Sequence, residues 1–378
     1  MKKIVLLFLL NIFLLNSVFS QEYEKKFIKG NISDKTTAVR EASGQEGIWL
    51  SNKAIEFVLE NYELLGNDRE LDALAVAAVL SLPNEYVFSL SENDKDILMN
   101  KFIDLFSKFN KSNTVQIAVQ SKVLSLKDYI NTAPFTDTLN KFLQSSSVLA
   151  SDSSLLKSVI NSLGFIGNNI SFTILYNYLN DKRFSNYTNE IEQSVTSLIS
   201  ISMNEVLQII HSHDINNIQK IFNLVKQSNN ISTANLCEIS ENILIDSKQV
   251  NLQLDALKIL NDNKWTRASA SVVNFFNESK KNFENKVITE NQFVDVINSL
   301  VNISPIDAVV PLIKYLGELN SQIEYNGNVS ENIALSVINS LGAIGDKSAF
   351  DSLLSVTYLN YSETVLSAAR QALAGLRW

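Results

Sequence analysis

The sequence predicts an all-α protein built as an array of helical hairpins, and composition and periodicity are the first two observations behind this. Apolar residues recur at three- and four-residue spacing, as in Leu71, Leu74, Ala75, Ala78 and Val79, which is the period of an amphipathic helix. Four prolines and eleven glycines are few for 378 residues, and they fall between the periodic segments. Sustained two-residue alternation, which would indicate strands, is absent.

An internal repeat is the third observation, and it indicates how the helices are organised. Residues 159–167 return almost unchanged as residues 337–345, and residues 296–301 are a shorter copy. All three copies begin Val-Ile-Asn-Ser-Leu, which we name the VINSL segment. The last two copies start 41 residues apart, a length that holds two helices and two turns. We expect about seven or eight antiparallel hairpins, stacked as a right-handed α-solenoid over residues 35–378.

The N-terminus is typical of an export signal. Lys2 and Lys3 precede an apolar run over residues 4–15, and this order is that of a secretory signal peptide. The run is shorter than the roughly 20 residues that a membrane-spanning helix needs. We therefore expect a cleaved signal peptide over residues 1–20, followed by a flexible polar leader over residues 21–34.

The number of cysteines excludes two covalent features, an internal disulfide and a lipid anchor. Cys237 is the only cysteine, so an internal disulfide and a lipid-anchored N-terminal cysteine are both excluded. We expect Cys237 to be a small buried residue. The predicted destination is the periplasm, with exposure at the cell surface or secretion left open.

The charge balance excludes two kinds of partner. The chain carries 32 basic and 40 acidic residues, a formal charge of −8, and loss of Lys2 and Lys3 would make it −10. Nucleic-acid binding relies on Lys and Arg that neutralise phosphates, and adhesion to anionic lipid needs the same charge. We expect neither, and we expect no integral membrane segment after signal cleavage.

The middle of the chain has the predicted alternation of helices and short connectors but lacks the VINSL segment. Periodic apolar residues predict helices over residues 203–212, 216–227, 249–261 and 266–280. Because the glycine-containing turn of residues 337–345 is missing there, we treat residues 200–290 as a divergent part of the array.

The final sixty to seventy residues resemble the HEAT family, in its short bacterial form known as HEAT-like or phycobilin-lyase-type repeats. The resemblance rests on residues 306–316, 340–346, 349–354 and 362–373, and residues 37–42 resemble the family's Val-Arg-x-Ala segment. It implies a HEAT/armadillo-like superhelix and a role in protein–protein interaction. Some relatives handle tetrapyrroles, but sharing a repeat does not transfer an activity.

The last copy of the repeat suggests how one hairpin ends and the next begins. We expect Gly342 to take the left-handed conformation that ends the helix and Ile344 to cover the helix end. Gly345 would make the reversal, and Asp346 or Ser348 would cap the next helix. Pro311 is expected to kink its helix because it removes one hydrogen bond.

The only histidines of the chain form its one candidate metal cluster. His211, His213 and Asp214 lie within four residues and could share a metal ion. The simpler interpretation is a polar turn in which Asp214 caps the following helix, because no fourth ligand is evident. Nothing places a serine or Cys237 beside either histidine as a nucleophile. We expect no metal, no cofactor and no catalytic residue.

Aromatic residues near helix ends are the candidate partner-binding residues. Tyr and Trp are favoured anchors of protein interfaces, and five of them lie near predicted helix ends or connectors: Tyr176, Tyr178, Trp265, Tyr358 and Tyr361. The alternative is that they seal the core or the edges of the hairpins. Trp378 could cover the end of the stack.

These observations predict a non-enzymatic protein–protein interaction module or assembly scaffold of the bacterial cell envelope, which binds a partner along its concave face. A periplasmic carrier or receptor for a hydrophobic small ligand is the alternative, and a deep apolar pocket around residues 200–290 would favour it. A tetrapyrrole lyase-like enzyme is a third possibility, and it would need titratable groups that converge in a cleft.

Overall fold

The computed structural model describes residues 22–66 and 68–377. Most of these residues lie in helices, and the bridge between Asp346 and Arg377 is the single β-type pairing among them. The prediction of an all-α protein is therefore confirmed. The predicted signal peptide over residues 1–20 and the predicted role of Trp378 lie outside the described residues.

The chain divides into two compact units. Unit 1 ends at Ile201 and unit 2 begins at Ser202, which is where the divergent middle of the sequence starts. Each unit is described by itself below.

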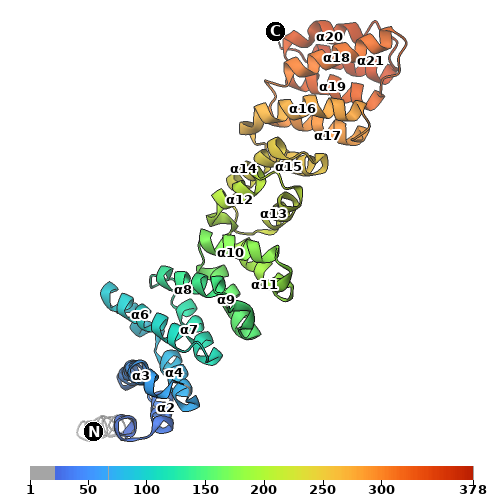
Figure 1. The fold of residues 1–378 in the computed structure, drawn as a ribbon. Helices are drawn as coiled ribbons and strands as arrows, with labels where there is room; N and C mark the ends of the chain where they lie inside the picture. The colour runs from blue at the N-terminus through green and yellow to red at the C-terminus, as the bar shows by residue number, and fades with distance from the viewer. Residues whose placement is uncertain (1–21, 67, 378) are drawn as a thin grey trace, which may run out of the picture. The chain divides into compact units, whose positions relative to one another are not determined.

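Unit 1 consists of short helices joined by tight connectors (Figure 1). The α-helices are α2 (Ile32–Glu41), α3 (Gly44–Leu65), α4 (Arg69–Ser81), α5 (Asn84–Phe88), α6 (Glu92–Lys108), α7 (Asn113–Ser125), α8 (Ala133–Gln144), α9 (Ser153–Ile166), α10 (Asn169–Leu179) and α11 (Thr188–Leu198). The 3₁₀ turns are η1 (Val148–Ala150), η2 (Lys182–Tyr187) and η3 (Ile199–Ile201).

The helices of unit 1 pack in pairs that form two rows. The pairs are α3 with α4, α6 with α7, α8 with α9 and α10 with α11. The first members of the pairs contact one another in succession and form row A. The second members do the same and form row B, with α2 packed on α4. Each helix of rows A and B can therefore bury an apolar face against two or more neighbours, which stabilises helices too short to persist alone.

The region expected to be a flexible leader contains helical structure. Residues 22–29 are helical, Phe27 is buried, and α2 begins at Ile32. The ammonium of Lys35 donates a hydrogen bond to the carbonyl oxygen of Phe27 and lies over the Phe27 ring. Burial lowers the pKa of Lys35. The sequence prediction missed this arrangement because the segment is polar overall and a single phenylalanine and one lysine hold it.

Unit 2 repeats the same organisation of helices joined by short connectors. The α-helices are α12 (Met203–His211), α13 (Ile215–Gln227), α14 (Thr233–Asp246), α15 (Val250–Asp262), α16 (Ser269–Glu284), α17 (Glu290–Ile303), α18 (Val309–Glu324), α19 (Glu331–Ile344), α20 (Phe350–Val356) and α21 (Glu363–Ala374). The 3₁₀ turns are η4 (Thr266–Ala268) and η5 (Lys347–Ala349). The four helices predicted between residues 203 and 280 are confirmed by α12, α13, α15 and α16.

Unit 2 also has two rows. The pairs are α12 with α13, α14 with α15, α16 with α17, α18 with α19 and α20 with α21. Row B consists of their second members, and its first helix, α13, reaches α15 through the Lys226–Asp255 ion pair. In row A, Lys280 of α16 forms an ion pair of 2.7 Å with Glu318 of α18. In the described parts of both units, the contacts define four pairs and five pairs, where the repeat length predicts about seven or eight in total.

The turn after the last VINSL segment differs from the prediction in one residue. Gly342 lies inside α19, and Gly345 is the residue in the left-handed conformation, at φ 71°. Asp346 caps the next turn as predicted, since its carboxylate accepts a hydrogen bond of 2.8 Å from the Ser348 N–H. Pro311 lies in the first turn of α18, where its missing N–H has no intrahelical partner. The predicted kink is therefore wrong.

Gly342 instead allows two helices of row B to come close. A Cβ atom on Gly342 would lie 2.8 Å from the Cβ atom of Ala372 in α21. Gly164, at the same position after the first VINSL segment, faces α11 in the same way, because its Cβ atom would lie 2.9 Å from the Ser194 Oγ atom. Real Cβ atoms do not make contacts of this length, so both positions require glycine for packing.

Within residues 22–66 and 68–377, no helix combines the length and the apolarity needed to cross a bilayer.

Candidate interaction groove

The asparagine of the VINSL segment is exposed in all three copies. Asn161 of α9, Asn298 of α17 and Asn339 of α19 face solvent, while the valine, isoleucine, serine and leucine around them are buried. The segment thus has two faces. Its apolar residues fill the core between the rows, and its asparagine lies on the outer surface of row B.

A cavity of about 780 Å³ lies on this surface, between α17 and α19 of unit 2. Five asparagines and two serines supply its polar lining, and four aliphatic residues supply the rest: Asn291, Val294, Asn298, Val301, Asn302, Asn332, Leu335, Ser336, Asn339, Ser340 and Ala343. None of these side chains carries a charge. We call this cavity the amide groove.

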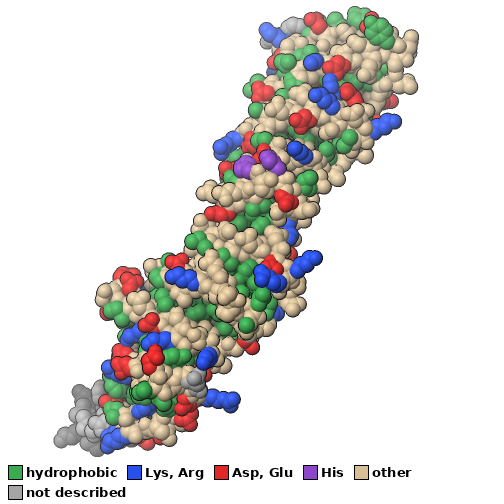
Figure 2. Space-filling view, in the orientation of Figure 1, with side chains coloured by type: hydrophobic (Ala, Val, Ile, Leu, Met, Phe, Trp, Pro, Cys, Tyr) green, Lys and Arg blue, Asp and Glu red, His purple; other side chains and the backbone are tan. Residues whose placement is uncertain are grey.

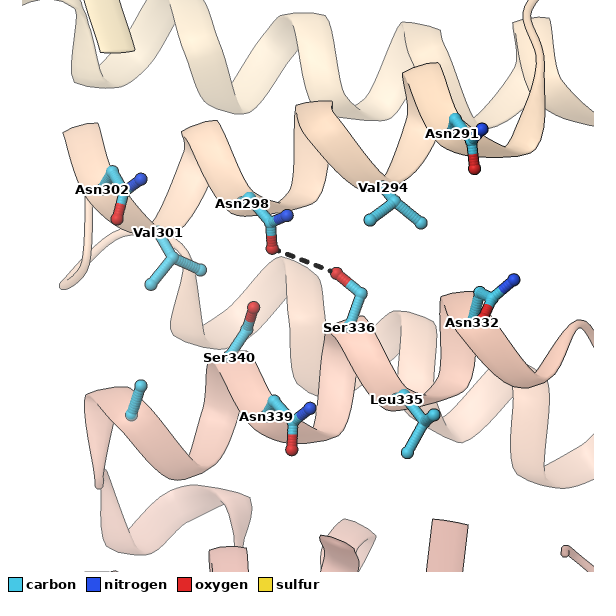
Figure 3. Close-up of a pocket in the computed structure, with 11 residues that line it drawn as sticks. Asn291, Val294, Asn298, Val301, Asn302, Asn332, Leu335, Ser336, Asn339 and Ser340 are labelled. Atoms are coloured by element: carbon cyan, nitrogen blue, oxygen red, sulfur yellow. Dashed lines mark hydrogen bonds between the residues drawn. The ribbon is translucent and has the colours of Figure 1, made fainter. Parts of the chain in front are cut away.

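Figure 3 shows how the two helices build the groove. Val294, Asn298 and Val301 point from α17 toward α19, and Ser336 and Ser340 point from α19 toward α17. Asn339 and Leu335 also line the cavity, and their side chains point away from α17 along the outer side of α19. Because the lining residues recur every three or four positions on each helix, they form continuous stripes along the groove.

Polar side chains link the helices of row B across this surface. The Ser336 hydroxyl donates to the Asn298 Oδ1 atom at 3.3 Å. One helix earlier, the Asn302 amide donates to the Asn261 Oδ1 atom at 3.0 Å. Among the described residues, the side chains of Asn291 and Asn339 have no hydrogen-bond partner, so both amides are available to a bound molecule.

A second cavity continues the groove on the other side of α17. It has a volume of about 470 Å³ and lies between α15 and α17. Asn298 lines both cavities. Unlike the amide groove, the second cavity is lined by charged residues, including Asp255, Lys258 and Asp295. It reaches into residues 200–290 and is not the apolar pocket that would favour a carrier of hydrophobic ligands.

The amide groove is suited to binding and not to proton transfer. An amide side chain offers two N–H donors and one carbonyl acceptor, and it does not titrate in water. General acid–base chemistry requires a group that gains or loses a proton, and the lining has none.

The predicted aromatic residues are mostly packed. Tyr176 is 5% exposed and lies nearly parallel to the Phe172 ring, so its side chain is part of the packing of unit 1. Tyr178 donates to the carbonyl oxygen of Leu143 and stacks on Phe184 with ring centroids 3.6 Å apart. These residues seal helix pairs, as the alternative interpretation stated.

The other three aromatic candidates differ in exposure. The Tyr361 hydroxyl donates to the Asn320 Oδ1 atom at 3.1 Å. The Trp265 indole is half-buried and donates to Glu241 at 3.4 Å. Tyr358 is 81% exposed. None of the five lines the amide groove.

Burial affects the ionisation of two of these tyrosines. It raises the pKa of both Tyr178 and Tyr361 to about 12, because desolvation disfavours the phenolate. At neutral pH both hydroxyls are therefore neutral hydrogen-bond donors that hold neighbouring helices together.

The histidine cluster forms a helix connection. Asp214 caps α13 by accepting hydrogen bonds from the N–H groups of Asn216 and Asn217, as the simpler interpretation predicted. The His211 Nδ1 atom lies 2.6 Å from the Asp246 Oδ2 atom of α14. Both histidines lie at the surface (Figure 2). In the described part of the chain, no three His, Cys, Asp or Glu side chains are arranged to hold a metal ion.

The structure also shows the surroundings of Cys237 and the distribution of surface charge. Cys237 is buried as predicted, and burial raises the pKa of its thiol, which disfavours the reactive thiolate. On the face drawn in Figure 2, Lys and Arg side chains are interspersed with Asp and Glu, unlike the basic stripe of a nucleic-acid-binding surface.

Comparison with models of known families gave no match, and neither did comparison with curated proteins.

The sequence contained the signal for the groove, but its meaning depended on the fold. The VINSL segment repeats an asparagine between buried residues, and asparagine has a poor helix propensity. A polar residue kept in mid-helix in three copies indicates an exposed stripe. Which of those stripes borders a cavity depends on how closely the next helix approaches, and that is a property of tertiary packing.

Proposed function

We propose that this protein is a non-enzymatic protein-interaction module or assembly scaffold of the bacterial cell envelope, in which HEAT-like hairpins stack as a solenoid. The partner docks on row B of unit 2. The observation that carries this proposal is the amide groove, a cavity with seven amide or hydroxyl side chains, four aliphatic ones and no charge.

The lining matches the chemistry of a polypeptide partner. Each residue of an extended chain offers one N–H donor and one carbonyl acceptor, and the free amides of Asn291 and Asn339 can bond to both kinds of group. Val294 and Leu335 offer apolar contact to small side chains between those bonds. The groove has no aromatic ring on which a nucleobase could stack.

The placement in the cell envelope rests on the export-type N-terminus of the sequence. Fractionation of cells that express the full chain with a C-terminal tag tests it. Recovery in the periplasmic fraction, with the N-terminal 20 residues removed, is the expected result. Recovery of the unprocessed chain in the cytosol would refute the placement.

An affinity capture from the same envelope fraction tests the docking face. The Asn298→Asp and Asn339→Asp substitutions keep the shape of the groove but introduce two unpaired negative charges, whose burial under a bound partner is costly. We expect the partner recovered by the natural chain to be lost by this double variant.

Asn274→Asp is the matched control, because Asn274 is exposed on α16 in row A and lies outside the groove. It should recover the partner as the natural chain does. Equal recovery by the control and by the double variant would exclude row B of unit 2 as the docking face.

A further inference from the structure

The three copies of the VINSL segment differ at the position that follows the leucine. This residue is Gly164 in α9, Val301 in α17 and Gly342 in α19. Gly164 faces α11 and Gly342 faces α21, the next helices of row B. Val301 points toward α19, its own next helix in row B (Figure 3). The same position therefore meets the neighbouring helix each time.

The two glycine positions are closed and the valine position is open. At Gly342 and at Gly164 there is no room for a Cβ atom, because the nearest atoms of the next helix, Ala372 Cβ and Ser194 Oγ, would lie 2.8 Å and 2.9 Å from it. Beside Gly164 the cavity between α9 and α11 has a volume of about 360 Å³. Beside Val301 the amide groove has about 780 Å³. A valine needs room for two methyl groups, so the helices that flank it cannot close as they do around glycine.

We propose that Val301 holds α17 and α19 apart and thereby makes this step of row B the docking site for one extended, uncharged polypeptide segment. The proposal rests on the proposed function and adds to it the position of the site, the residue that creates it and the chemistry of the segment that it takes.

The length of the groove fits an extended segment. The lining of α17 runs from Asn291 to Asn302, which at 1.5 Å per residue corresponds to roughly 16 Å. An extended chain advances about 3.3 Å per residue, so about five residues fit along the groove. Amides on both helices lie within this length, at Asn291 and Asn298 of α17 and at Asn332 and Asn339 of α19.

The chemistry of the groove selects an uncharged segment. Its polar groups are amides and hydroxyls, which bond to main-chain N–H and carbonyl groups without neutralising a charge. A lysine or glutamate inserted here would lose its hydration and find no counter-charge in the lining. Small or aliphatic side chains can instead contact Val294, Val301 and Leu335.

The first test measures the spacing without any partner. Val301→Ala removes the two methyl groups and does not reduce helix propensity. In crystal structures of the full chain, the cavity between α17 and α19 should shrink toward the 360 Å³ seen beside Gly164. Val310→Ala is the control, since Val310 is 73% exposed in the first turn of α18 and lies outside the groove. An unchanged cavity in Val301→Ala refutes the spacing role and leaves the proposed function untouched.

The second test identifies the occupant with a defined probe, a random linear-peptide phage library selected on the full chain. We expect enriched peptides with an uncharged core of about five residues. Val301→Ala should weaken their binding by about tenfold or more, as loss of a central contact does, and Val310→Ala should not. Replacing one core amide of the peptide by an ester, which removes an N–H donor, should weaken binding by roughly fivefold.

The outcomes separate the alternatives. Selected peptides that bind Val301→Ala as tightly as the natural chain, or that need a charged core, refute the docking site but not an interaction role elsewhere. Binding to a panel of envelope glycans in place of peptides, or a peptide-free dimer of the chain sealed through this groove, refutes the polypeptide occupant. Peptide binding that depends on Val301 and on the core amides supports the proposal in full.

Discussion

Two neighbouring steps of row B in unit 2 have the same repeated segment and different packing. Between α19 and α21, Gly342 lets the helices close until no Cβ atom fits. Between α17 and α19, where Val301 takes that place, a cavity of about 780 Å³ opens. The comparison shows that the VINSL residues build the core of each hairpin, while the residue that follows them sets the spacing to the next one.

The largest expected effect is that of removing the leucine of a VINSL segment, and it tests whether the three copies are packed in equivalent cores. Leu163, Leu300 and Leu341 occupy the same place in the three copies and are at most 1% exposed. Substitution of any one by alanine should destabilise the protein by about 2–5 kcal/mol, through lost burial and the cavity left behind. Chemical denaturation followed by circular dichroism measures this. If only one of the three substitutions is costly, the copies do not share one core architecture.

The step between α19 and α21, which we call the closed step, should not accommodate one added methyl group without a loss of stability. Gly342→Ala places its Cβ atom against Ala372, and overpacking of this kind costs about 1–3 kcal/mol. Gly317→Ala is the matched control, because Gly317 lies within α18 and a Cβ atom there would have no neighbouring atom within 4 Å. At this position the better helix propensity of alanine should stabilise the protein by up to about 1 kcal/mol. Thermal unfolding of both variants gives the comparison.

A second substitution sharpens this result. Ala372→Gly removes the atom that the new methyl group meets, so the double variant should recover part of the stability lost in Gly342→Ala. Equal loss in the single and double variants would mean that the two helices are not held by this contact.

Tyr361 ties the connector before α21 to α18 through its hydrogen bond to Asn320, and its burial gives the stability of unit 2 a dependence on alkaline pH. The pKa of Tyr361 is about 12 in the folded protein, against 10.0 for an unperturbed tyrosine. Because the folded pKa is the higher one, the stabilisation is complete below pH 10 and is lost as pH rises from 10 to about 12. Tyr361→Phe should flatten this loss in denaturation curves, and an unchanged pH profile would show that other groups dominate it.

The smallest effects concern the asparagines, and they separate binding from folding. Asn339 has no hydrogen-bond partner among the described residues, so Asn339→Ala should leave stability unchanged or raise it by a few tenths of a kcal/mol through helix propensity. Asn298→Ala removes the acceptor of the Ser336 hydroxyl and should cost about 0.5–1 kcal/mol. A large loss in Asn339→Ala, measured by thermal unfolding, would identify the residue as structural and weaken its assignment to the groove.

The spacing of apolar residues predicted the helices, because that spacing depends on which residues each helix buries. The four helices between residues 203 and 280 follow from apolar periodicity, and the caps at Asp214 and Asp346 follow from the preference of aspartate for helix N-termini. These features depend on a few neighbouring residues, so the sequence displays them directly.

Features that depend on the approach of distant segments were missed. Gly342 and Gly345 are both plausible helix ends in the sequence, and only the position of Ala372 in α21 shows that Gly342 is needed for close packing. Tyr176 looks like a surface anchor until α10 is placed beside its neighbours. The amide groove belongs to the same class, because it arises between two helices about forty residues apart in the chain.

The valine that follows the middle copy of the VINSL segment, Val301, also has a genetic consequence. Glycine and valine codons differ only at their second base, so one nucleotide substitution converts the residue of a closed step into that of an open one. The buried residues of the VINSL segment need not change for this to happen. The spacing between two hairpins can thus be changed by a single point mutation that leaves the buried residues of both hairpins as they are.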